Sequence, residues 1–188
     1  MDPITLAVDK VEELLGHSPH PAIVTVPLGA WPVSNVCDGL ALATGDDRYD
    51  DAASISMAIG LIGAAGAVVT GLRDYSHIPK DRPSHEIATT HGLGNAVVGS
   101  LMAASYILRT RDRAAGRPTG VTARLLGLTG GCLSLYTAWL GGKLVEEMGE
   151  GVQPVMDQQQ EQEALEGEEH PHGRERLSPE SPLGHAHG

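Results

Sequence analysis

The sequence predicts an all-α integral membrane protein in which four transmembrane helices form a bundle, preceded by a short amphipathic helix and followed by a disordered tail. Two observations predict this fold class. Four uncharged, apolar stretches have about the length that crosses a bilayer, and the polar residues gather at the two ends of the chain, so a mean hydropathy close to zero conceals an apolar middle. We expect three parts: a helix at 1–16, a transmembrane domain at 17–152 and a tail at 153–188.

The first residues have the pattern of a short amphipathic helix. Asp2 and Pro3 are typical of a helix start, and Gly16 of a helix end. Between them, apolar residues recur at helical spacing: Ile4, Val8, Val11 and Leu15. The opposite face is mostly acidic, so we expect this helix to dock on the bundle or on a partner rather than on anionic lipid. No basic region leads into an apolar core, and a signal peptide is not expected.

The four predicted spans are 21–37, 52–72, 87–108 and 125–142. Each is close to the roughly 20 residues that cross about 30 Å of hydrocarbon. The first span contains Pro27 and Pro32 and is expected to be kinked. All four are rich in Gly and Ala, which allow close packing of membrane helices. A soluble bundle would need a polar stripe on each helix, and residues 60–69 contain none.

An even number of spans places both termini on the same side of the cell membrane. The opposite side carries more arginine, chiefly in the connection between the third and fourth spans, at positions 109, 111, 113, 117 and 124. Because Lys and Arg near span ends favour the cytoplasm, this multi-pass protein is expected to have extracytoplasmic termini. Asp38 lies near the arginine-rich face, and we expect it to pair with Arg109 or Arg124.

Histidines carry the clearest functional signal, because the alternation of spans brings five of them to one membrane face: His17, His20, His77, His85 and His91. His91 lies inside the third span, where ionisable residues are costly and usually have a partner. A neutral imidazole there can bind haem iron or a divalent metal, with Asn95 one turn further along as a hydrogen-bond partner. The alternative is a histidine that bonds to a neighbouring helix and stabilises packing.

A metal ion is the second possibility for the same face. His17 and His20 are placed to share an ion with Asp74 or His77, so the candidate metal ligands are His17, His20, His77 and His91. The alternative is that His17, His77 and His85 are interfacial residues that face water. The tail at 153–188 lacks apolar periodicity and is expected to be disordered, with histidines that bind metal weakly or are incidental.

Other protein classes are not indicated. The net charge of −11 argues against nucleic acid as a partner, because phosphate binding relies on clustered Lys and Arg. The two cysteines, Cys37 and Cys132, lie in apolar segments, where a packing role is expected. No hydrolase, kinase or zinc motif is present, so the protein is not expected to act as an enzyme on its own.

Five short blocks resemble one bacterial membrane family. They are GHSPHP at 16–21, PAIVTVPLGAW at 21–31, TGLRDY at 70–75, HGLGN at 91–95 and WLGGKLV at 139–145. Together they resemble the family known as domain of unknown function 2231, from about Gly16 to Val152. That family is similar to small four-span b-type cytochromes. The resemblance implies a haem or redox role, with His20 and His91 at the positions that carry over.

The sequence therefore predicts a membrane redox or electron-transfer module that binds haem b, or alternatively a divalent metal ion. His20 and His91 would be the ligands, with Asn95 and Asp74 beside them. Lipid, a redox partner protein and further copies of this chain are the expected partners. The competing hypothesis is a membrane scaffold without a cofactor, which would recruit a partner through its N-terminal helix and acidic tail.

Overall fold

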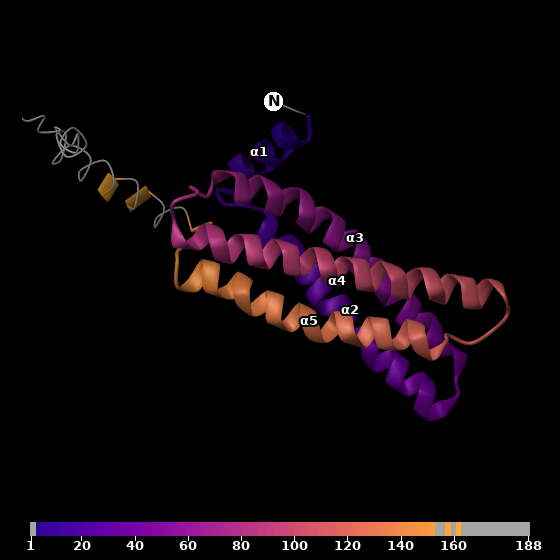
Figure 1. Ribbon diagram of the computed structural model, residues 1–188. Helices are drawn as coiled ribbons and strands as arrows, with labels where there is room; N and C mark the ends of the chain where they lie inside the picture. The colour runs from indigo at the N-terminus through magenta and orange to yellow at the C-terminus, as the bar shows by residue number, and fades with distance from the viewer. Residues whose placement is uncertain (1–2, 153–156, 159–160, 163–188) are drawn as a thin grey trace, which may run out of the picture. The chain divides into compact units, whose positions relative to one another are not determined.

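The computed structural model describes residues 3–152, 157–158 and 161–162. The chain divides into two units, Met1–Val152 and Gln153–Gly188, and the first contains every element discussed below. The tail predicted to be disordered lies almost wholly outside the described residues. Within the described part of the first unit all regular structure is helical, and its elements are α1 (Pro3–Leu15), α2 (His20–Thr44), α3 (Asp47–His77), α4 (Pro83–Ala114) and α5 (Val121–Glu146) (Figure 1).

The four long helices run antiparallel to their neighbours in chain order (Figure 1). α2 packs mainly on α3 and α4 mainly on α5, and we call these pairs the first hairpin and the second hairpin. Further contacts of α3 with α4 and of α2 with α5 close a ring, and neither diagonal pair is in close backbone contact. Side chains from three of the helices fill the centre, namely Trp31, Met57, Val98 and Met102. The predicted four-helix bundle is confirmed.

Each of the four long helices is longer than the apolar segment predicted for it. α3 has 31 residues and would extend about 46 Å at 1.5 Å per residue, more than the hydrocarbon thickness of about 30 Å. Among the described helices, α3 is the one that is long and apolar enough to cross a membrane by length and composition alone. α2 continues through Pro27 and Pro32, while α4 and α5 carry buried polar residues that lower their hydropathy.

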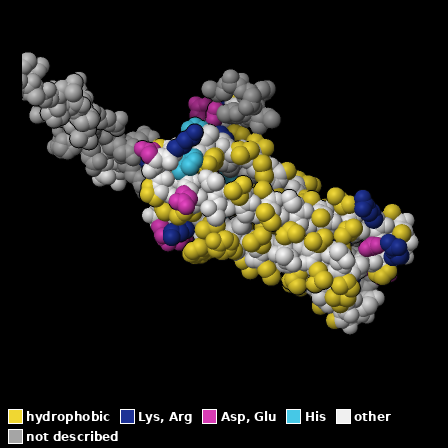
Figure 2. Space-filling view, in the orientation of Figure 1, with side chains coloured by type: hydrophobic (Ala, Val, Ile, Leu, Met, Phe, Trp, Pro, Cys, Tyr) yellow, Lys and Arg dark blue, Asp and Glu magenta, His cyan; other side chains and the backbone are white. Residues whose placement is uncertain are grey.

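The outer surface of the bundle is apolar on all four long helices. Val36 on α2, Ile62 on α3, Leu93 on α4 and Leu135 on α5 each expose more than 60 % of their surface. Figure 2 shows hydrophobic side chains over the middle of the bundle and charged ones near its two ends. Removing so much apolar surface from water is favourable at about 25 cal/mol per Å², so this exterior matches a lipid environment.

α1 docks on α3 through charge, so of the two docking sites expected for it, the bundle or a partner, the structure shows the bundle. Arg73 donates from Nε to Asp9 Oδ1 at 3.0 Å and forms a second ion pair with Glu12. Val8 is buried beneath the helix, but Leu14 remains 86 % exposed and Leu15 is also exposed. The apolar side of α1 is therefore only partly covered by the bundle.

The connection between α4 and α5 is fixed by one carboxylate and gives a pH prediction. Asp112 accepts hydrogen bonds from Arg117 Nη2 at 2.6 Å and from the Gly120 N–H at 3.0 Å, and these two donors lower its pKa below the ordinary value. A lowered pKa stabilises the fold above the ordinary value of about 3.9, and this stabilisation is lost as the pH falls through the lowered pKa.

We therefore expect amide exchange at Gly120, measured by NMR, to accelerate only below about pH 4. In Asp112→Asn the amide oxygen still accepts a hydrogen bond but does not titrate. Once the Gly120 exchange rate is corrected for the intrinsic pH dependence of amide exchange, the acceleration at low pH should therefore be absent in this variant. An unchanged acid step in the variant would contradict the assignment to Asp112.

Candidate functional site

The first part of the site is His20, the first residue of α2, which precedes the first apolar segment. Its Nδ1 lies 3.0 Å from Thr70 Oγ1 on α3. The Thr70 hydroxyl donates to the Gly66 carbonyl at 3.1 Å, so it accepts from the imidazole. Burial lowers the pKa of His20, and Asp74 acts in the opposite direction. The imidazole is therefore held neutral with its proton on Nδ1.

The second part is His91 on α4, two turns into the helix. Its Nδ1 lies 2.8 Å from the Thr137 carbonyl on α5, and because a carbonyl only accepts, Nδ1 carries the proton. Nε2 accepts from Asn95 Nδ2 at 3.0 Å, and the Asn95 oxygen accepts from the Thr137 hydroxyl at 2.9 Å. The predicted partnership of His91 with Asn95 is confirmed, and so is its bond to a neighbouring helix.

Both imidazoles are pressed against a glycine of the facing helix. A Cβ added at Gly71 would lie 2.8 Å from His20 Cε1, and one added at Gly141 would lie 3.0 Å from His91 Cε1. These approaches are closer than ordinary van der Waals contact, so each ring fits only because the facing residue has no side chain. We call the region of His20, Thr70, His91 and Thr137 the histidine end.

The arrangement leaves both imidazoles in the same chemical form. Each Nδ1–H is donated to the facing helix, and each Nε2 keeps its lone pair. This is the tautomer of a histidine that ligates haem iron or a metal ion, in which the second nitrogen is bonded to a protein acceptor. At His91 a ligand would have to displace the Asn95 amide, whereas no protein donor to His20 Nε2 is found among the described residues.

The other predicted residues of this face lie in different places. Asp74 accepts from Ser18 Oγ at 2.6 Å and acts electrostatically on His20, so it belongs to the histidine end. His17 and His77 are exposed, and each bonds to a backbone carbonyl of its own segment. The structure therefore does not gather His17, His20, His77 and His91 into one cluster. Among the described residues, no group of three or more His, Cys, Asp or Glu side chains is arranged to hold a metal ion.

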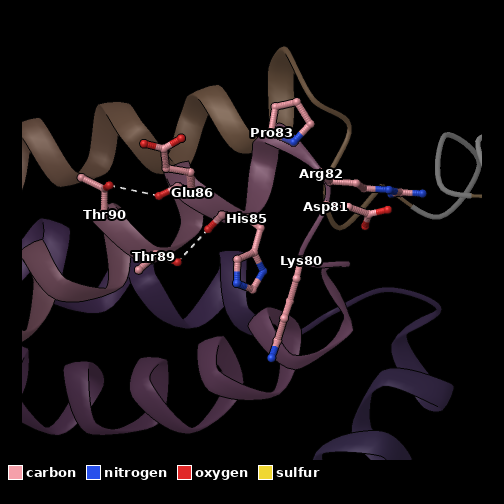
Figure 3. A pocket seen from close by; sticks show the side chains of 8 residues that line it. All are labelled: Lys80, Asp81, Arg82, Pro83, His85, Glu86, Thr89 and Thr90. Carbon is pink, nitrogen blue, oxygen red and sulfur yellow. Dashed lines mark hydrogen bonds between the residues drawn. The ribbon is translucent and has the colours of Figure 1, made fainter. Parts of the chain in front are cut away.

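His85 lines a separate pocket of about 630 Å³ at the start of α4 (Figure 3). Its ring packs against Tyr75 at a tilt of 31° with centroids 4.7 Å apart, and Tyr75 Oη lies 2.9 Å from His85 Nε2. Figure 3 shows Thr89 bonded to the carbonyl one turn earlier, and Thr89 Oγ1 also contacts Tyr75 Oη at 2.8 Å. These contacts join α3 to α4. Neither His20 nor His91 lines the pocket.

The opposite end holds a buried charge network to which every long helix contributes one residue. Arg109 on α4 is 2 % exposed and forms a two-pronged ion pair with Asp38 on α2, with Nη1 at 2.8 Å from Oδ1. Arg124 on α5 reaches Asp38 Oδ1 at 3.2 Å and Asp50 on α3 at 2.6 Å. We call these four residues the arginine end. The pairing predicted for Asp38 is confirmed with both arginines.

Three polar residues of the site were not identified from the sequence. Thr70 and Thr137 accept hydrogen bonds from the two imidazoles. Ser18 is buried, and its hydroxyl donates a hydrogen bond to Asp74. Thr70 stands in the TGLRDY block, which was a usable signal. Thr137 contributes its backbone carbonyl, and because every residue has one, the residue type does not identify the acceptor.

An exterior of aliphatic side chains, charged ends and an interior that contains buried serine, threonine and charged side chains beside its apolar core are typical of an α-helical membrane-protein bundle. A family model described as "Predicted membrane protein (DUF2231)" matches residues 16–154, and the chain belongs to this family. Comparisons with curated proteins and with solved structures give no match.

Proposed function

We propose that this membrane protein is a multi-pass redox module that binds b-type haem at the histidine end, with His20 and His91 as axial ligands. The observation that carries the proposal is the shared tautomer: two neutral imidazoles, each fixed through Nδ1, each with an Nε2 lone pair. Bound haem would supply one-electron transfer.

The surrounding residues have defined tasks in this proposal. Thr70 and the Thr137 carbonyl orient the two rings and keep Nδ1 protonated, which makes Nε2 the ligating atom. Asn95 holds His91 Nε2 when no ligand is present. Asp74 counteracts the desolvation of His20 and remains tied to Ser18. A redox partner protein would approach this end, where the imidazoles lie nearest the bundle surface.

The same proposal places all four long helices across the cell membrane with extracytoplasmic termini. Support comes from Arg111, Arg113 and Arg117, which are exposed beyond the last apolar turns of α4. Because Arg and Lys near span ends favour the cytoplasm, these residues favour a cytoplasmic arginine end.

The test is a reduced-minus-oxidised absorption spectrum of the protein purified in mild detergent from haem-supplemented cells. We expect a stoichiometric b-type signal, and its loss in both His20→Ala and His91→Ala. His77→Ala is the matched control, because His77 is exposed at the same end and should leave the signal intact. Helical circular dichroism and gel filtration show that each variant is folded.

A signal that survives in both ligand variants would contradict the ligand assignment. A blank spectrum together with a blank metal analysis would contradict the redox function as a whole. A blank spectrum with a positive metal analysis would mean that a divalent ion, and not haem, is bound by the Nε2 atoms of His20 and His91.

A further inference from the structure

The two hairpins correspond in sequence at a separation of 71 residues between α2 and α4 and of 70 residues between α3 and α5. Five pairs of positions 71 residues apart, in α2 and α4 or just after these helices, carry the same residue, and they include His20 and His91, Ser34 and Ser105, and Gly45 and Gly116. Positions 70 residues apart in α3 and α5 do so again: Ala53 and Ala123, Gly60 and Gly130, Gly71 and Gly141. Shared residues are few, but they fall at the contacts that build each hairpin.

The contacts between these residues are also repeated. Ser34 Oγ donates to the Ala53 carbonyl at 2.8 Å, and Ser105 Oγ donates to the Ala123 carbonyl at 2.6 Å. Both serines are fully buried, so each bond joins the two helices of its hairpin at the same level. No local sequence rule produces such bonds, because their partners are 19 and 18 residues apart.

The glycine contacts follow the same correspondence. His20 lies on Gly71 as His91 lies on Gly141. Trp31 lies on Gly60, and Met102, which is 71 residues after Trp31, lies on Gly130. Each hairpin also has a glycine with positive φ after its first helix: Gly45, with φ of 69°, directly follows α2, and Gly116, with φ of 66°, comes one residue further from the end of α4.

From these repeated contacts we infer that the bundle consists of two copies of one helical hairpin, related by a pseudo-twofold axis parallel to the helices, and that His20 and His91 are equivalent halves of one ligand site on that axis. Both hairpins start at the histidine end, so the repeat is parallel and not inverted. The ligand part of this inference rests on the proposed function, whereas the repeat itself does not.

The arginine end shows that equivalent positions face each other across the axis. Asp38 and Arg109 are 71 residues apart, and they are the two partners of the buried ion pair. Two identical charges at these positions would repel each other, so the copies differ there in sign. His20 and His91 precede this pair by 18 residues each, which is about five full turns of an α-helix. The imidazoles therefore lie on the same axis-facing side as the ion pair.

The repeat is tested with two spin-label pairs that the axis makes equivalent. Val36 on α2 with Cys132 on α5 corresponds to Ile107 on α4 with Ile62 on α3, and all four positions are exposed on the apolar exterior. The first pair needs Val36→Cys and Cys37→Ser. The second needs Ile62→Cys and Ile107→Cys, with both native cysteines replaced by serine.

Pulsed electron paramagnetic resonance on the full chain in detergent should give the same mean distance for both pairs. The diagonal pair Val36→Cys with Ile107→Cys is the control and should give a different distance. Mean distances for the two equivalent pairs that differ by more than the width of either distribution would overturn the repeat.

The spectrum of the bound group tests the other half of the inference. Equal distances with no haem or metal would leave the repeat standing, overturn the shared ligand site and contradict the proposed function. Haem bound through one histidine alone, shown by loss in His91→Ala but not in His20→Ala, would overturn the shared site while a redox function stands. Matched losses in both variants, with equal distances, support the inference as a whole.

Discussion

Asp38→Ala is expected to lower the free energy of unfolding by about 3–5 kcal/mol, because it leaves a buried arginine without its carboxylate. Arg109 directs both terminal nitrogens at Asp38, and its remaining bond, from Nε to Ser105 Oγ, supplies no charge. Asp38 and Arg109 are 5 % and 2 % exposed, so water cannot replace the lost partner. Titration with a denaturing detergent, followed by circular dichroism, measures the loss.

Two further variants separate this effect from the general cost of a substitution. Arg48→Ala removes an exposed ion pair with Asp46 but keeps the backbone N–H at position 48 that Asp46 caps, so it should leave the unfolding curve almost unchanged. Asp38→Leu combined with Arg109→Met removes both charges and should recover most of the stability. Arg124 retains Asp50 in this double variant. A double variant no more stable than Asp38→Ala would show that packing, and not the unpaired charge, determines the loss.

Gly63→Ala is expected to destabilise the bundle by about 1–3 kcal/mol, because the added methyl group overpacks the α2–α3 interface. Its Cβ would lie 2.6 Å from Val26 Cγ1, 2.7 Å from Val26 Cβ and 2.9 Å from Pro27 Cδ. A Cβ atom and a proline ring move only with the backbone, so α2 itself has to shift. The same detergent titration measures this change.

Gly29→Ala is the matched control for this variant. Gly29 lies in α2 with nothing within 4 Å of an added Cβ, so the substitution should cause no loss and has the helix propensity of alanine in its favour. Equal losses in both variants would mean that glycine is needed for backbone reasons and not for close packing.

The sequence predicted the helices well and their ends poorly. The second predicted span, 52–72, lies inside α3, which begins at Asp47 and ends at His77. The apolar segment is bounded by charged residues, but the helix extends past them, because Asp47 and Asp50 in its first turn interact favourably with the helix dipole. The same reason extends α4 to Ala114 beyond its last apolar turn, where Arg111 and Arg113 occupy the final turn.

The site was predictable where its partners lie one helical turn apart and not elsewhere. His91 and Asn95 are four residues apart on one helix, and that bond followed from spacing alone. The acceptors for the two imidazoles lie 50 and 46 residues away, on helices whose rotation depends on packing. The internal repeat has a weak sequence signal, because few residues are shared and the separation changes from 71 to 70 residues between the two helices of a hairpin.

The difference between the two ends of the bundle determines where it would open. At the arginine end the ion pairs cross both diagonals and link all four long helices, so moving any one helix away from the other three breaks at least one charge contact. At the histidine end the described bonds between hairpins run from Tyr75 to His85 and Thr89, which join α3 to α4. The bundle is therefore held together at the arginine end and along the α3–α4 interface. We expect it to open at the histidine end of the α2–α5 interface, where a ligand of the two imidazoles would enter without breaking the ion pairs.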